Sequence, residues 1–332
     1  MVYIYRKKTG EKNYYYLRAS ERRGEKVIVK DIAYLGNSLE EVKKSLEKLP
    51  KYSAQIRKAY KTIHNFLESN RYIEKIKNTK IKRNDFLGDK TKEIEACKLH
   101  YSTEFKKQEI LTKKEIFKNF IIEFAYNTTA IEGNTIKLAE ARNLLEEGLN
   151  PKNKSLREIY DVQNTEKVFL DIIDTKEELS HKFIVFIHEK LMDKIDGRLG
   201  YRTSDVRVIK SNFKATPAPY VKTDMNLLLK WFNENREKLH PLVLASIFHH
   251  KFEKIHPFMD GNGRTGRMLL NYILLKKDYP PVVIRTKSRK TYLDALKKAD
   301  KNNLTKVDRD KYIELVLFVA DQLTQSYWNI FL

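Results

Sequence analysis

Residues 256–267 read His-Pro-Phe-Met-Asp-Gly-Asn-Gly-Arg-Thr-Gly-Arg. Apolar residues at helical spacing resume directly behind this segment, from Met268 to Leu275. The pattern predicts a glycine-containing loop that leads into the N-terminus of a helix over 263–276. Such a helix start is suited to binding phosphate, because its unpaired N–H groups and the positive end of its dipole attract an anion.

The side chains of this segment are those that phosphoryl or nucleotidyl transfer requires. Arg264 and Arg267 are candidate phosphate ligands, since a guanidinium group pairs with two oxygens at once. Asp260 is a candidate Mg²⁺ ligand, and His256 is a candidate base because imidazole titrates near neutral pH. Further candidate donors to phosphate are the backbone N–H groups of Gly261, Asn262 and Gly263.

Composition narrows the class of protein. The 332 residues are 41% hydrophobic, and no apolar run reaches the length of a membrane span, so we expect a soluble protein without a membrane partner. Cys97 is the only cysteine, which argues against a disulfide framework and favours a cytoplasmic setting.

The first 100 residues carry an excess of positive charge, since they hold 25 Lys/Arg against 13 Asp/Glu within a total net charge of +21. This excess would suit contact with nucleic acid or with an acidic protein, but a lysine-rich proteome with solvated helix faces is the favoured explanation.

The N-terminal region is predicted to be a small β-structure followed by helices. Residues 2–6, 13–18 and 26–34 are rich in Tyr, Val and Ile and are separated by turns at Gly10 and Gly24, which predicts a three-stranded antiparallel meander over 1–37. Short helices are expected over 38–49 and 52–75, and the Lys- and Asn-rich stretch 76–92 is interpreted as a linker. We therefore divide the chain into a meander (1–37), a helical linker region (38–100) and a main domain (101–332).

The main domain is predicted to be helical. Helical periodicity is expected over 113–127, 138–147, 154–173, 181–192, 222–236, 241–254, 263–276, 288–299 and 308–328. Residues 197–221 are the exception, since their glycines, imperfect alternation and prolines predict a β-hairpin flap or else a plain connection. His249 and His250, on the helix before the loop, are interpreted as structural.

The segment 256–267 resembles the Fic-domain signature at every defining position, and the resemblance extends over about residues 113–325. It implies a mainly α fold, a Fic-type helical bundle with a β-hairpin flap. It also implies protein adenylyltransferase activity: AMP moves from ATP, with Mg²⁺, to a side-chain hydroxyl. By this resemblance His256 is the catalytic base, Asp260 the metal ligand and Arg264 and Arg267 ligands of the β- and γ-phosphates, while Gly261, Asn262 and Gly263 hold the α-phosphate. Gly263 and Arg264 fit the AMP-transferring branch better than the phosphate-transferring one.

A second motif resembles the family's inhibitory motif. Thr128-Thr129-Ala130-Ile131-Glu132-Gly133 would end an inhibitory helix over about 113–133, with the Glu132 carboxylate paired with Arg267. The alternative is a surface acid beside a glycine that stops a helix. Tyr292 and Asp300 are implied to hold adenine, although Tyr292 would equally suit the core. Residues 213–220 of the flap are candidates to align the target protein.

Several functions remain open on the sequence. The leading one is an autoinhibited protein adenylyltransferase that modifies a protein substrate or itself. A de-AMPylase that uses Glu132 to activate water is an alternative. A third is a nucleic-acid-associated regulator that acts through the basic N-terminal region, whose tyrosines (Tyr3, Tyr5, Tyr14, Tyr15, Tyr16) are first interpreted as sheet packing. Relatives often dimerise, but no residue pattern here indicates an interface.

Overall fold

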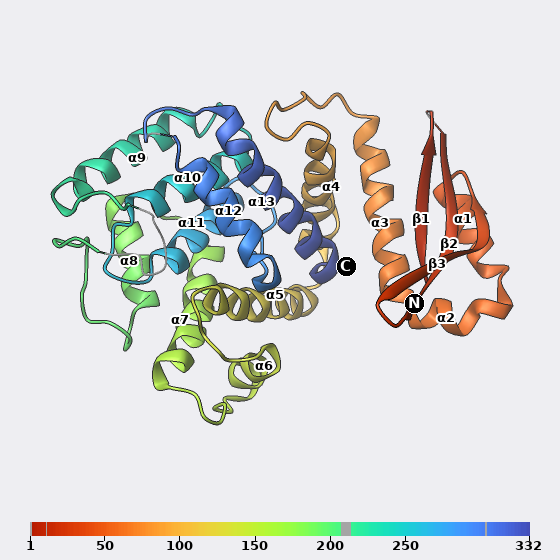
Figure 1. Cartoon of the computed structure of the whole chain (residues 1–332), viewed down its shortest axis with the longest axis horizontal. Helices are drawn as coiled ribbons and strands as arrows, with labels where there is room; N and C mark the ends of the chain where they lie inside the picture. The colour runs from red at the N-terminus through yellow and green to blue at the C-terminus, as the bar shows by residue number, and fades with distance from the viewer. Residues whose placement is uncertain (1, 11, 207–213, 303) are drawn as a thin grey trace. The chain divides into compact units, whose positions relative to one another are not determined.

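The computed structural model describes residues 2–10, 12–206, 214–302 and 304–332. The chain divides into two compact units, Met1–Ile81 and Lys82–Phe331. The elements of each unit can be followed in Figure 1.

The N-terminal unit contains the predicted meander. Strands β1 (Val2–Thr9), β2 (Lys12–Arg23) and β3 (Lys26–Gly36) form an antiparallel sheet in the order β1-β2-β3. The turn between β2 and β3 needs a residue with a left-handed backbone, and Gly24 takes that position with φ 62°. Three helices follow, namely α1 (Leu39–Glu47), α2 (Ser53–Lys58) and α3 (Tyr60–Lys77). The expected antiparallel sheet is thus confirmed.

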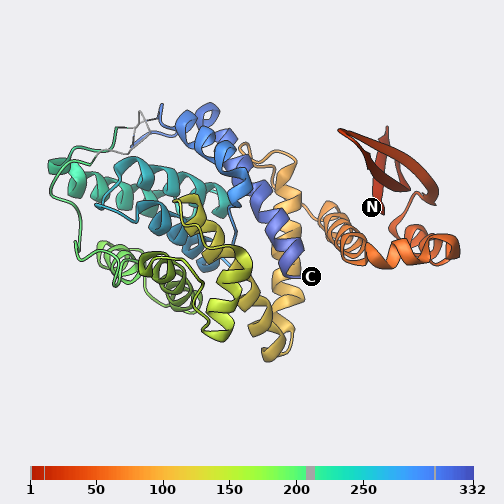
Figure 2. The same ribbon diagram turned by 60° about the horizontal axis from the view of Figure 1, so that its bottom comes forward.

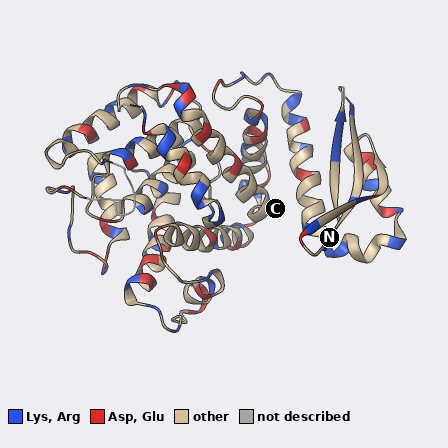
Figure 3. Ribbon diagram, viewed as in Figure 1, with Lys and Arg blue, Asp and Glu red and all other residues tan. Residues whose placement is uncertain are grey.

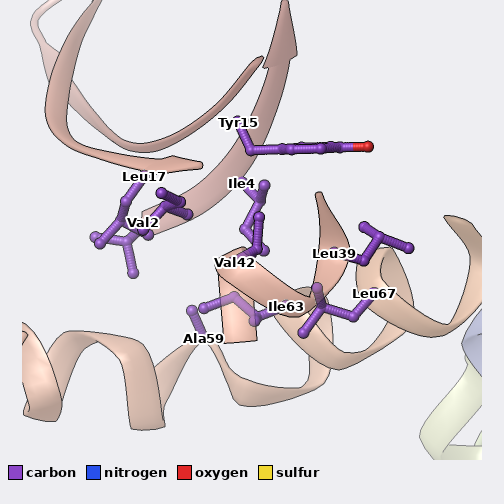
Figure 4. Packing of buried hydrophobic residues seen from close by; sticks show 10 residues of the cluster. Val2, Ile4, Tyr15, Leu17, Leu39, Val42, Ala59, Ile63 and Leu67 are labelled. Atoms are coloured by element: carbon purple, nitrogen blue, oxygen red, sulfur yellow. The ribbon is translucent and has the colours of Figure 1, made fainter. Parts of the chain in front are cut away.

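One face of this sheet builds the core of the N-terminal unit. Alternate residues of a strand point to the same face, so Val2, Ile4 and Leu17 lie together. They pack against Val42 of α1 and Ile63 of α3, as Figure 4 shows. All five side chains are buried, so helices α1 and α3 cover this face.

Within the described residues of the second unit, all regular secondary structure is helical. Its helices are α4 (Lys90–Thr103), α5 (Ile110–Ile131), α6 (Leu138–Glu147), α7 (Leu156–Ile173), α8 (His181–Leu191), α9 (Val221–Asn235), α10 (Pro241–Ile255), α11 (Asn262–Lys276), α12 (Arg289–Ala299) and α13 (Arg309–Ile330). Helices α10 and α11 pack on each other in the middle, as Figures 1 and 2 show. Helices α5, α7 and α8 contact α11, whereas α9 and α13 contact α10. The predicted helical bundle is confirmed, and within the described ranges no helix has the length and apolar character to cross a membrane.

Helix α4 was not predicted from the sequence. Its buried residues include Thr91 and His100 beside Ile94 and Cys97, so no continuous apolar stripe marks the helix. The helix packs on α13, where His100 Nδ1 lies 2.7 Å from the Tyr327 hydroxyl. Polar residues are buried here because α13 supplies a hydrogen-bond partner, which sequence periodicity cannot reveal.

The centre of the predicted hairpin flap, residues 207–213 with Val208, Ile209 and Phe213, lies outside the described residues. Its described flanks, 197–206 and 214–221, contain no strand. Arg202 attaches the first flank to the loop before α11: its backbone N–H donates to the Pro257 carbonyl at 2.9 Å, and its Nε donates to the His256 carbonyl at 2.7 Å.

Candidate active site

The loop between α10 and α11 is fixed by its own residues. His256 ends α10 with a left-handed backbone of φ 54°, and Gly261, with φ 76°, begins α11. Asn262 closes the loop, because its Oδ1 accepts from the Phe258 N–H and its Nδ2 donates to the Phe258 carbonyl, both at 2.9 Å. The Asn262 amide is therefore committed to the loop, which leaves the backbone N–H groups at the start of α11 as donors to a phosphate.

His188 of helix α8 contacts the loop and supports it. Phe258 is fully buried and stacks on the ring of His188 with a centroid distance of 3.6 Å. His188 Nε2 also lies 3.0 Å from the Asp260 carbonyl. Burial lowers the pKa of His188 to about 4, so the ring is neutral and this nitrogen donates. The sequence contained no signal for His188, which lies 72 residues before Asp260.

His256 has the protonation state that a base needs. Burial lowers the pKa of its imidazole below the ordinary value of 6.5. The ring is therefore neutral near pH 7 and able to accept a proton. Its position is set from the main chain, where Arg202, itself buried, donates to the His256 carbonyl.

Arg267 is held by the end of α5. Its side chain is only 3% exposed. Its Nε donates to the Thr128 hydroxyl at 2.7 Å, and its Nη2 donates to the Thr128 carbonyl at 2.9 Å and to Glu132 Oε1 at 2.6 Å. The structure thus brings together two residues that lie 135 positions apart in the sequence.

Glu132 reaches Arg267 by lying over the first turn of α11. The chain leaves α5 at Gly133, whose φ of 108° suits glycine. A Cβ atom at Gly263 would clash with the Glu132 carboxylate, so any larger residue there would force this side chain to move. The Glu132 carboxylate therefore occupies the space above Gly263 and beside Arg267, where a phosphate bound at the helix start would also lie.

Arg264 is paired with two carboxylates. Its guanidinium contacts Asp161 of α7, and its Nη2 lies 3.3 Å from Asp260 Oδ1. Arg157, also of α7, pairs with the other oxygen of Asp260. Burial opposes ionisation of Asp260, but the charges of Arg264 and Arg157 and the hydrogen bond from the Gly261 N–H together outweigh it and lower the pKa of this carboxyl, so Asp260 is ionised. Asp161 and Arg157 carried no motif in the sequence.

The residues around Asp260 fit a Mg²⁺ ion that is bound through substrate. The described residues contain no group of three or more His, Cys, Asp or Glu side chains that would form a metal cage. Mg²⁺ usually takes one or two carboxylates and completes its shell with phosphate oxygens and water. An ionised Asp260 beside the start of α11 would supply such a carboxylate.

Tyr292 and Asp300 contact two histidines of α10. Tyr292 is 1% exposed, and its hydroxyl is 2.6 Å from His249 Nε2. Asp300 Oδ1 lies 3.0 Å from His250 Nε2, and His250 Nδ1 lies 3.0 Å from the hydroxyl of Tyr312. Both histidines are buried and hydrogen-bonded. Binding of adenine by Tyr292 and Asp300 stays a prediction.

A buried acid lies on the other side of Arg267. Glu253 of α10 has a side chain that is 17% exposed, and its Oε1 is 3.9 Å from His249 Nδ1. Both groups press against Gly266, where a Cβ atom would meet Glu253 Oε1 at 2.6 Å. Burial raises the pKa of Glu253 to about 8, so its carboxyl is protonated at neutral pH. Glu253 was not singled out in the sequence, because three residues before His256 it reads as an ordinary polar helix position.

Comparison with known proteins shows a similarity to one family. Residues 178–274 match the Fic/DOC family. The chain is 32% identical over 187 residues to the protein adenylyltransferase fic-1 of Caenorhabditis elegans, a match that covers 54% of this chain and 37% of that protein. It is 33% identical over 230 residues to the protein adenylyltransferase Fic of Drosophila erecta, covering 64% and 44%. The chain spans less than half the length of either relative.

Solved structures show the same fold. A Fic-domain-containing signaling protein from Bacteroides thetaiotaomicron superposes with a TM-score of 0.65 at 24% identity, over 70% of this chain and 94% of that one. A fragment of C. elegans Fic-1 gives 0.61 at 28% identity, over 72% and 69%. A Fic family protein from Desulfovibrio desulfuricans gives 0.61 at 28% identity, over 74% and 75%.

Proposed function

We propose that the protein is an autoinhibited protein adenylyltransferase that uses MgATP, because residues 178–274 match the Fic/DOC family and the similar proteins are named protein adenylyltransferases. The protein would transfer AMP to a Ser, Thr or Tyr hydroxyl of a protein substrate, or of itself, and release pyrophosphate. The observation that carries this proposal is the arrangement of a neutral His256 next to a helix start that bears Arg264 and Arg267.

The reaction follows from the positions of these groups. The triphosphate would lie on the N-terminus of α11, with the backbone N–H groups near Gly261 and Gly263 on the α-phosphate and Arg264 and Arg267 on the outer phosphates. His256 would take the proton of the target hydroxyl as its oxygen bonds to the α-phosphorus. The bond from the α-phosphorus to the bridging oxygen then breaks, and pyrophosphate leaves. Mg²⁺ bound at Asp260 would neutralise charge on the phosphates.

Inhibition would arise from competition for Arg267. The Glu132 carboxylate accepts from Arg267 at 2.6 Å, and a γ-phosphate would need the same guanidinium. Two anions cannot share one buried cation without a large electrostatic cost. Glu132 would therefore keep the triphosphate out, or hold it in a position where the α-phosphorus does not face His256.

The flap would bring the target hydroxyl to His256. Its described second flank is held in place, since the Thr216 hydroxyl donates to Asp224 at 2.6 Å and the Ala218 N–H donates to Asp205 at 2.7 Å. We propose that 213–220 pairs with an extended segment of the target, although Phe213 lies outside the described residues.

The test compares nucleotide transfer by four forms of the full chain, incubated with labelled ATP and Mg²⁺. Glu132→Gly should raise AMP transfer by at least about tenfold, because Arg267 becomes available to the γ-phosphate. His256→Ala should abolish transfer. The matched control is Glu147→Gly, which changes an exposed acid that also precedes a glycine at a helix end, at the end of α6.

Two outcomes would contradict the proposal. An unchanged rate in Glu132→Gly would reject autoinhibition by this residue. If an AMP-modified protein is the substrate and Glu132→Gly abolishes release of AMP, the de-AMPylase function is supported instead, because Glu132 then activates the water.

A further inference from the structure

The second face of the N-terminal sheet has an unusual composition. The register pairs Tyr3 with Arg18, Tyr5 with Tyr16 and Lys7 with Tyr14, and Tyr16 is paired on its other side with Tyr34. These residues lie on the face opposite to Val2, Ile4 and Leu17. The tyrosine face, as we call it, consists of Tyr3, Tyr5, Lys7, Tyr14, Tyr16, Arg18 and Tyr34.

The tyrosines of the chain's first strands therefore have two different roles. Tyr15 is 1% exposed and packs edge-on against Phe66 of α3, so it belongs to the core. Tyr3, Tyr5, Tyr14 and Tyr16 are half-buried, and Tyr34 is 53% exposed. The first interpretation, that the tyrosines of β1 and β2 are sheet packing, is confirmed for Tyr15. Tyr34 of β3 was not part of that interpretation and belongs to no core cluster.

The half-buried rings of Tyr5 and Tyr16 and the exposed ring of Tyr34 form a row across all three strands. The Tyr16 and Tyr34 rings lie 5.4 Å apart between centroids, and Tyr16 is the direct neighbour of Tyr5. The Arg18 guanidinium lies 3.4 Å above the Tyr5 ring and pairs with Asp31. A row of rings with a flat guanidinium offers stacking surfaces to planar groups.

The same strands are strongly basic. From Val2 to Asp31 the sequence holds nine Lys or Arg against four Asp or Glu. Figure 3 shows the blue of lysine and arginine along the β1–β2 hairpin. Lys7 shares the tyrosine face, and Lys8 and Lys12 follow at the hairpin end. Positive charge beside stacking surfaces matches a polyanion that carries planar groups.

We propose that the tyrosine face binds single-stranded nucleic acid, with bases stacked on Tyr16 and Tyr34 and phosphates near Lys7 and the hairpin end. Duplex nucleic acid fits poorly, because its bases are already stacked on each other and offer no free faces to the tyrosines. An acidic peptide would use the positive charge but not the rings. The proposal does not depend on the transferase activity.

The experiment measures binding of labelled oligonucleotides of about 16 nucleotides to the full chain by fluorescence anisotropy. Single-stranded DNA and RNA should bind with an affinity that falls steeply with salt, whereas the matching duplex and polyglutamate should bind weakly. Tyr34→Ala and Tyr16→Ala should each weaken binding of the single strand by roughly tenfold, and Tyr34→Phe should retain it, since phenylalanine keeps the stacking ring.

Matched controls separate this site from general attraction. Tyr60→Ala removes a 65% exposed tyrosine from α3 and should leave binding unchanged. Lys7→Gln should reduce the slope of log affinity against log salt concentration by about one, whereas Lys58→Gln, at the end of α2, should reduce this slope less. Circular dichroism checks that each variant is folded. Equal effects of Tyr34→Ala and Tyr60→Ala, tight binding of polyglutamate, or no binding of single strands would each overturn the proposal.

Discussion

At the scale of single residues, two glutamates beside Arg267 differ in their charge, because Glu132 is paired with the arginine whereas Glu253 is protonated. Glu132 is 43% exposed and accepts a hydrogen bond from Arg267, so it acts as an anion. Burial raises the pKa of Glu253 to about 8, despite the charge of Arg267 that acts against this rise. Arg267 is thus left with one charged partner that solvent can reach, and this partner can be displaced by a phosphate.

The pKa of Glu253 predicts a pH-dependent stability. In the unfolded chain Glu253 ionises near its ordinary pKa of 4.5, whereas in the folded protein it stays protonated up to about pH 8. Between these values the folded state holds the extra proton, so its stability falls as the pH rises. Glu253→Gln should therefore match the wild type near pH 4 and exceed its free energy of unfolding by on the order of 4 kcal/mol near pH 8.

Urea unfolding of both forms across this pH range measures the difference. Glu147→Gln, an exposed acid on α6, serves as the control and should give a difference that does not change with pH. Parallel curves for Glu253→Gln and the wild type would show that Glu253 is ionised in the folded protein.

Among the elements, helix α7 depends on one acid at its start. Ser155 and Glu158 form a capping box, in which the Glu158 N–H donates to Ser155 Oγ at 3.2 Å and the Ser155 N–H donates to Glu158 Oε2 at 3.0 Å. Glu158 also accepts from the Thr135 N–H at 2.9 Å, just after the end of α5. The helix start that carries Arg157 and Asp161 is thereby connected to the segment behind Glu132.

Glu158→Ala should loosen both the start of α7 and the segment after α5 that contains Thr135. Loss of the carboxylate leaves the N–H groups of Thr135 and Ser155 without this acceptor, so their hydrogen exchange should rise by about tenfold or more, while exchange in the middle of α7 stays slow. Hydrogen–deuterium exchange resolved by NMR or mass spectrometry measures this, and Glu147→Ala is the control. Hydrogen bonds from Thr135 lower the pKa of Glu158 to about 2, so the protection should be present above pH 4.5 and be lost as the pH falls toward 2.

For the whole molecule, the division into two units falls after Ile81 rather than near residue 100. Helix α4 lies in the second unit and buries Ile94, Cys97 and Tyr101. A fragment of residues 82–332 should therefore unfold in one cooperative transition and keep the proposed nucleotide-transfer activity. A fragment of residues 104–332 lacks α4 and should melt at least about 10 °C lower, because part of α13 becomes exposed.

Thermal unfolding by circular dichroism, with transfer assays on both fragments, tests this prediction. Equal melting temperatures would mean that α4 adds nothing to the second unit. Loss of folding in both fragments would mean that the helical unit requires the N-terminal one.

The sequence by itself determined the features that are local. Segments rich in Tyr, Val and Ile between turns at Gly10 and Gly24 marked the strands, helical periodicity marked most helices, and the segment 256–267 marked the loop before α11, because in each case the deciding residues are close in the chain. The tertiary structure alone decided the rest. It joined segments that are distant in the sequence. Examples are the pairing of Glu132 with Arg267, the support of the loop by His188, the contact of Asp161 with Arg264, and the grouping of Tyr5, Tyr16 and Tyr34 on one face of the sheet. Such contacts depend on how helices and strands pack, and burial then sets the charge of Glu253 and His188, which no sequence pattern reports.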